Sequence, residues 1–184
     1  MVPMFERTSD FSIDITCPGK SDHTFHLKRV ENMDALVERF LAATRKKFFC
    51  RRPVFEKYRE ATEDDLGEIE QRVGAMLPSC LRLWLLLAGF GDLNEELSFR
   101  AEWFNAIDRG RLKGYVIFAQ DDGGHFYAFS PVSGAIFFIR RSAPEYALIA
   151  GDFVAFMDAF ETHGFELQKW TDSLESLPYE WTAV

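Results

Sequence analysis

Alternating apolar and polar residues open the chain. Apolar side chains take every second position over residues 11–16, and Phe25 and Leu27 repeat the alternation within residues 23–30. Pro18 and Gly19 lie between the two runs, and both residue types favour turns. This pattern predicts a β-hairpin before residue 31.

The period then changes to that of a helix. After Asn32, a residue suited to a helix N-cap, apolar side chains recur three and four positions apart. They are Met33, Leu36, Val37, Phe40, Leu41 and Phe48. We expect this helix to end in the basic residues Arg45, Lys46 and Lys47, because cations suit a helix C-terminus.

Two further helices are predicted after residue 60. Thr62 and Asp65 form a capping-box pattern, and the following apolar stripe consists of Leu66, Ile69, Val73 and Met76, with Gly74 near its end. Pro78 suits the first turn of the next helix, which is apolar on all sides and is therefore expected to be buried. Gly89 and Gly91 mark its end.

A third pattern follows from residue 115. Residues 115–119, 125–129 and 135–139 are short runs rich in aromatic and β-branched side chains, separated by turn residues. The simplest interpretation is an antiparallel meander. Asp152 can then cap a closing helix that ends at Gly164.

Together these patterns predict an α+β fold with an antiparallel sheet flanked by helices. We expect residues 61–184 to form the main domain and residues 1–60 to be a hairpin-plus-helix extension packed on it. The charge is divided in the same way. The chain has a net charge of -8, of which residues 1–60 carry +3 and residues 61–184 carry -11.

The second part also resembles a known family. Its ordered features are Glu70 on the helix after Thr62, the Leu77-Pro78 step, Trp84, the Gly89-Phe90-Gly91 turn, the Asp122-Gly123-Gly124 turn and the helix after Asp152. In this order and spacing they resemble the SUKH superfamily over residues 60–163. That superfamily groups fungal cell-wall-assembly regulators with bacterial toxin-immunity proteins.

The resemblance implies a protein-binding role without catalysis. Most of the shared residues look structural: Glu70 is expected to hold a helix terminus or a turn, and Gly123 and Gly124 permit an unusual backbone. The leading hypothesis is an immunity protein that binds and neutralises a toxin, for example a nuclease. The alternative is a regulatory scaffold related to the cell-wall regulators. We expect no enzymatic activity, cofactor or bound metal.

Several local motifs admit a chemical interpretation that their context disfavours. Gly19-Lys20-Ser21 imitates the end of a phosphate-binding loop, but no helix is predicted after it. Asp121 and Asp122 suit a cation loop less well than a solvated turn, because the other carboxylates of an EF-hand are missing. His125 has no evident nucleophile beside it.

Charge indicates the kind of partner. The acidic residues near the turns of the second part are Asp92, Glu95, Glu96, Glu102, Asp121 and Asp122. They suit a solubilising surface, and they also suit a face complementary to a basic partner; we predict that they contact a protein with a basic surface. The basic run from Arg45 to Arg52 resembles a nucleic-acid patch, yet the helix end explains it more simply. We therefore expect neither nucleic acid nor a membrane as the partner.

The cysteine count bears on the compartment. Cys17, Cys50 and Cys80 are an odd number without a CxxC pair, and the first residues do not form a signal peptide. Reduced thiols in the cytoplasm are the simplest explanation.

Overall fold

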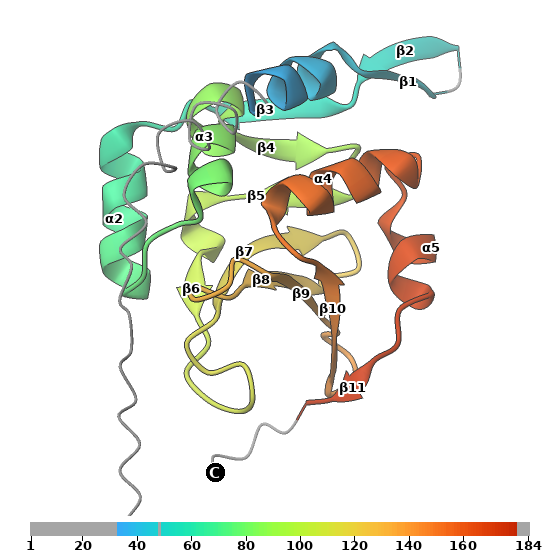
Figure 1. Cartoon of the computed structure of the whole chain (residues 1–184). Coiled ribbons are helices and arrows are strands. Elements are labelled where there is room, and N and C mark those ends of the chain that lie inside the picture. The colour runs from blue at the N-terminus through green and yellow to red at the C-terminus, as the bar shows by residue number, and fades with distance from the viewer. Residues whose placement is uncertain (1–32, 48, 180–184) are drawn as a thin grey trace, which may run out of the picture.

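The structure, a computed structural model, describes residues 33–47 and 49–179 (Figure 1). Within these ranges the chain forms one long antiparallel sheet with helices packed against it, so the predicted α+β class is confirmed. The predicted hairpin over residues 11–30 and the phosphate-loop imitation within it lie outside the described residues.

The main sheet runs in the order β11-β10-β9-β8-β7-β5-β4-β3, and β6 pairs with β7 beside this path. All of its pairings are antiparallel. Its strands are β3 (Phe55–Arg59), β4 (Phe90–Leu93), β5 (Leu97–Phe99), β6 (Asn105–Ala106), β7 (Val116–Asp121), β8 (Phe126–Phe129), β9 (Ile136–Ile139), β10 (Glu145–Ala150) and β11 (Leu177–Pro178).

The predicted helix after Asn32 is shorter than expected. Its described residues are 33–42, with Met33, Leu36, Val37 and Phe40 buried as its core-facing stripe. Leu41 is already 43% exposed, so the stripe ends one turn before the basic residues. The next apolar position of the prediction, residue 48, lies outside the described residues. Between Leu41 and residue 48 the sequence has no strongly apolar side chain that could hold another helical turn against the core.

The basic residues consequently lie on strands and not at a helix end, which corrects the prediction. β1 (Thr44–Lys47) and β2 (Cys50–Pro53) form a separate two-stranded hairpin. Hydrogen bonds from Val54 N–H to the Ala43 carbonyl and from Asn94 N–H to the Val54 carbonyl tie the base of this hairpin to the end of β4. The chain then enters the main sheet through β3, a strand that the hydrophobic pattern did not predict.

The next two helices are confirmed in position. α2 (Glu63–Val73) begins at the complete capping box of Thr62 and Asp65 and ends at Gly74, whose φ of 68° is left-handed. α3 (Ser79–Ala88) follows Pro78. Glu70 holds the turn between them, because its Oε1 accepts the Leu77 N–H (3.0 Å) and lies 3.1 Å from Arg82 Nη1. The prediction of full burial for α3 was wrong at Leu87, which is 42% exposed.

Two glycines do more than end α3. Gly89 has a φ of 91°, and a Cβ there would lie 2.5 Å from the Arg59 carbonyl oxygen. At Gly91 a Cβ would lie 2.3 Å from the Glu56 carbonyl oxygen. A side chain at either position would therefore push β4 away from β3. The pair that the pattern marked only as a helix stop also permits close pairing of these strands.

The meander and the closing helix are confirmed. β7, β8 and β9 occupy the three predicted runs, with ends that differ by at most two residues. α4 (Phe153–Thr162) is capped by Asp152, whose Oδ1 accepts the Ala155 N–H at 2.8 Å. β10 and α5 (Leu167–Asp172) were not predicted; they continue the sheet and follow α4.

Trp84 of α3 lies at the centre of the main core. Its ring centroid is 5.5 Å from that of Phe40 and 5.6 Å from that of Phe55, both in edge-on geometry. It also lies 6.2 Å from Phe99 and from Phe153. One fully buried side chain thus joins the first helix, α4 and two strands, so residues before position 60 share the core of those after it.

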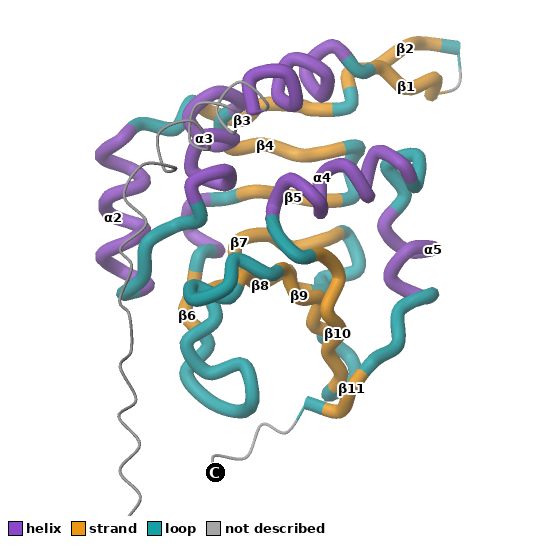
Figure 2. The backbone as a smooth tube through the Cα atoms, viewed as in Figure 1, coloured by secondary structure: helices purple, strands orange, loops and turns teal. Residues whose placement is uncertain are grey.

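A second, smaller cluster lies on the other face of the sheet. There the buried side chains of Ala128 on β8, Ile139 on β9 and Tyr146 on β10 pack with Ile107, Leu112 and Tyr179. Figure 2 shows the long loop before β7 and the segment around β11 at this end of the molecule. The domain division at residue 60 stays a prediction.

Candidate functional site

Acidic side chains gather where two hairpin turns and one helix connection meet. The β4–β5 turn supplies Glu95 and Glu96, the β7–β8 turn supplies Asp121 and Asp122, and the α4–α5 connection supplies Glu166. We call these five residues, which lie at one end of the main sheet, the acidic end. The Asp122 N–H donates to the Glu96 carbonyl oxygen (3.2 Å), which joins the two turns.

Glu96 is a half-buried carboxylate that joins the β4–β5 turn to the start of α5. Its Oε2 accepts the Leu167 N–H at 2.8 Å, at the start of α5. Partial burial raises the pKa of Glu96, and the negative charges of Asp122 and Glu166 raise it further. The Leu167 hydrogen bond and Arg45 act in the opposite direction. Carboxylates are therefore held close together here against their mutual repulsion.

Asp121 is a structural residue of its turn. Its Oδ1 accepts the His125 N–H (2.7 Å), and its Oδ2 accepts the hydroxyl of buried Tyr127 (3.1 Å). Burial raises the pKa of Asp121 and raises that of Tyr127 well above its usual range. Gly124, with a φ of 78°, closes the turn. The interpretation of a hairpin turn therefore fits, although only Asp122 is the exposed, solvated member.

Asn94 ties the β4–β5 turn to the helices. It has a left-handed φ of 55° and is 7% exposed, and its Nδ2 donates to the Phe165 carbonyl oxygen at 2.7 Å. That bond fixes which end of the amide is the oxygen. The Oδ1 atom is buried and accepts no hydrogen bond within the described ranges.

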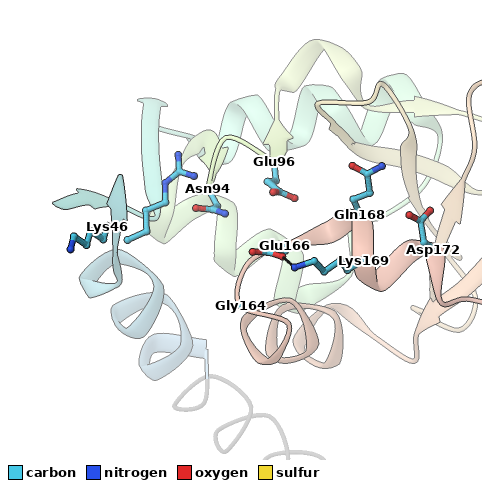
Figure 3. Close-up of a pocket in the computed structure, with 9 residues that line it drawn as sticks. Lys46, Asn94, Glu96, Gly164, Glu166, Gln168, Lys169 and Asp172 are labelled. Atoms are coloured by element: carbon cyan, nitrogen blue, oxygen red, sulfur yellow. Dashed lines mark hydrogen bonds and ion pairs between the residues drawn. The ribbon is translucent and has the colours of Figure 1, made fainter. Parts of the chain in front are cut away.

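Asn94, Glu96 and Glu166 line an open pocket of about 660 Å³, whereas Glu95, Asp121 and Asp122 lie outside its lining. Figure 3 shows Asn94 and Glu96 from the β4–β5 turn, Glu166 from the α4–α5 connection, and Gln168 and Asp172 from α5 around it. Cations are also present: Lys169 Nζ lies 2.6 Å from Glu166 Oε2, and Arg45 Nη2 lies 2.9 Å from Glu95 Oε1. The pocket is polar, and its carboxylates are partly neutralised by the chain's own cations.

Two of the six predicted acids lie elsewhere. Asp92 is on β4, where it accepts the Ser98 hydroxyl, and it lies opposite Ser98 in the sheet register. Because successive side chains of a strand alternate in direction, Asp92 and Leu93 face opposite sides of the sheet. Glu102 follows β5 at the end of the sheet where β6 pairs with the start of β7, far from Asp121 at the end of β7.

The sequence did not indicate Asn94, Glu166 or Gln168. Glu166 and Gln168 follow the predicted helix stop at Gly164, and the hydrophobic pattern predicted no further element there. Their proximity to Glu96 comes from the docking of the α4–α5 connection on the β4–β5 turn. Hydrogen bonds across 71 sequence positions make this contact.

The residues with catalytic or metal-binding potential have structural partners. His125 Nδ1 accepts the Arg141 N–H (3.1 Å), and its ring packs 5.3 Å from Phe138. Among the described residues, no group of three or more His, Cys, Asp or Glu side chains could hold a metal ion. No described helix is both long enough and apolar enough to cross a membrane.

The fold and the site define an α+β protein with a long antiparallel sheet and a polar, carboxylate-rich pocket at one sheet end. A family model described as SMI1 / KNR4 family (SUKH-1) matches residues 60–159. The chain therefore belongs to this family, as the sequence resemblance indicated, and its members are generally non-enzymatic and bind proteins. No curated protein and no solved structure matches the chain.

Proposed function

We propose that this protein binds a basic protein partner through the acidic end and acts as an immunity protein that neutralises a toxin. The observation that carries the proposal is Glu96. Its carboxylate is held beside Asp122 and Glu166 although the environment raises its pKa. A cationic side chain placed among these groups would relieve their repulsion.

The geometry offers more than net charge. The acceptors are mounted on backbone that is tied by hydrogen bonds to Leu167, Phe165 and His125. Little conformational freedom remains to be lost when a partner binds. Lys169 and Arg45 would compete with the partner, which lowers affinity and increases discrimination for a well-placed cation.

Where a toxin gene lies beside this gene, the first test uses its toxin domain. We expect a complex by isothermal titration calorimetry and loss of toxin activity on mixing. The variant Glu95→Gln/Glu166→Gln should associate about tenfold more slowly at low salt, because it removes two charges from the binding face. The matched control Glu68→Gln/Asp108→Asn removes two exposed acids elsewhere and should associate at the wild-type rate.

Two results would count against the proposal. Absence of both complex and inhibition would remove the immunity role. Equal slowing in the control would show that total charge, and not the acidic end, governs association.

The alternative within the family is a regulatory scaffold that binds signalling or cell-wall proteins. The same acidic end would then contact a basic host protein. The gene neighbourhood separates the two roles: a large toxin gene with a variable C-terminal domain beside this gene supports immunity, and an isolated gene supports the scaffold.

A further inference from the structure

The β1–β2 hairpin stands apart from the main sheet. Its strands pair with each other, and Figures 1 and 2 show it projecting beyond the end of the sheet. All four residues of β2 are exposed, and Phe49 at the tip is 101% exposed. Core packing therefore does not explain the aromatic side chain at this position.

The register places cations opposite cations. Arg45 pairs with Arg52, and Lys46 pairs with Arg51. Like charges directly opposite each other destabilise an antiparallel pair. Glu95 offsets this cost at Arg45. Within residues 33–47 and 49–179, no acidic side chain forms an ion pair with Lys46, Arg51 or Arg52. The hairpin thus keeps a repulsive arrangement that a polyanion would relieve.

We propose that the β1–β2 hairpin binds single-stranded nucleic acid. Arginine side chains suit phosphate groups because their guanidinium donors match the phosphate oxygens. An exposed ring next to such cations can stack on an unpaired base, and this combination is typical of surfaces that bind single strands.

The placement of the side chains favours a flexible strand over a duplex or a membrane. Successive residues of a strand point to opposite faces, so Arg52 lies on one face of the ribbon and Lys46 with Arg51 on the other. A flexible single strand can follow cations on both faces, whereas a membrane surface meets one side. Stacking by Phe49 also requires bases that are not already paired.

The rest of the protein limits the affinity. The chain carries a net charge of -8, and Glu95 lies at the base of the hairpin. Its acidic body repels a polyanion beyond the reach of the hairpin, so binding is expected to be weak and to fall steeply with salt. This inference is independent of the acidic end.

The test is fluorescence anisotropy of the full chain with a labelled 12-nucleotide oligouridine. We expect Arg51→Gln/Arg52→Gln to weaken binding at least tenfold and to reduce the slope of log K against log salt by about 1.4, that is, about 0.7 per charge. Phe49→Ala should weaken binding about tenfold through lost stacking. The matched control Arg111→Gln/Lys113→Gln removes two exposed cations from the loop before β7 and should bind as wild type.

Other outcomes would overturn the inference. These are no binding by the wild-type chain, equal weakening in the control, or tighter binding to a 12-base-pair duplex that Phe49→Ala does not affect. Binding to phosphatidylserine vesicles without binding to the oligonucleotide would assign the hairpin to a membrane. Circular dichroism of each variant verifies folding. Glu95→Gln/Glu166→Gln should bind the oligonucleotide at least as tightly as wild type, which separates this result from a failure of the toxin test.

Discussion

The acidic end and the β1–β2 hairpin lie next to each other, yet they hold their charges in opposite ways. Hydrogen bonds to backbone or buried groups fix Glu96 and Asp121. By contrast, Arg51 and Arg52 extend from an exposed ribbon. Arg45 is the link, since it belongs to the hairpin and pairs with Glu95.

The acidic end and the hairpin therefore present their charged side chains in two different ways. A carboxylate that accepts hydrogen bonds from buried groups, as Asp121 does, is preorganised for one geometry, and its removal also damages the fold. An exposed cation on a ribbon contributes little to the fold and can adapt to a partner. Stability should therefore respond strongly to the loss of Asp121 and weakly to changes at the exposed Asp122 and in the hairpin.

The largest effect is expected for Asp121→Ala. It removes the acceptor of the buried Tyr127 hydroxyl and of the His125 N–H, and an unsatisfied buried donor is costly. We expect a loss of about 3 kcal/mol in the free energy of unfolding in urea. Asp122→Ala, the exposed neighbour, should change it by less than about 0.5 kcal/mol. Equal effects at the two positions would show that Asp121 is not a structural residue.

Asn94 comes next. Asn94→Ala loses the hydrogen bond to Phe165 and places a Cβ-bearing residue without a polar side chain at a φ of 55°, with an expected cost of about 2 kcal/mol. Asn94→Gly tolerates the φ and should cost about 1 kcal/mol by the same urea measurement. If glycine proved worse than alanine, the left-handed backbone would not be the source of the difference.

The dependence on pH should be smaller. Since the pKa of Glu96 is raised on folding, the folded state holds its proton more tightly than the unfolded state. Ionised Glu96 thus costs stability at pH 7, and the cost disappears as pH falls through the raised pKa toward the ordinary value. Glu96→Gln should be more stable than wild type at pH 7, with the gap closing toward pH 4.5. Urea titrations across this range measure the gap; a constant gap would contradict the assignment.

The smallest effect is expected in the hairpin. Lys46→Glu places an acid opposite Arg51 and replaces repulsion by attraction, which should stabilise the fold by about 0.5 kcal/mol. The control Lys113→Glu changes the net charge equally at an exposed loop position and should have no comparable benefit. Differential unfolding in urea at low salt measures both. Destabilisation by Lys46→Glu would indicate that Lys46 has a structural role.

Much of the fold could be predicted because its signals are local. The capping box at Thr62, the left-handed residue at Gly74 and the cap at Asp152 each involve neighbours within a few positions. The failures occurred where local signals were ambiguous. The local pattern indicates only a helix stop at Gly91, because its other role depends on β3, more than thirty positions away in the chain.

The candidate site shows the same limit. Composition placed an excess of acids after residue 60, but it could not distinguish Glu102, at the far end of the sheet, from Glu96. The contribution of Glu166 depends on α5 docking against the β4–β5 turn. Pairing of the turns and helices selects which acids become neighbours, and sequence spacing does not report this.

The sequence by itself determined the α+β class, the meander, the capped helices and the family, because periodicity and capping act between residues that are close in the chain. Only the tertiary structure decided that the cations after residue 44 belong to an exposed hairpin and that four of six predicted acids meet at one end of the sheet. Strand register and the burial of Trp84 among distant elements set those positions. Such contacts join residues that are far apart in the chain, and sequence spacing alone does not show that they are close in space.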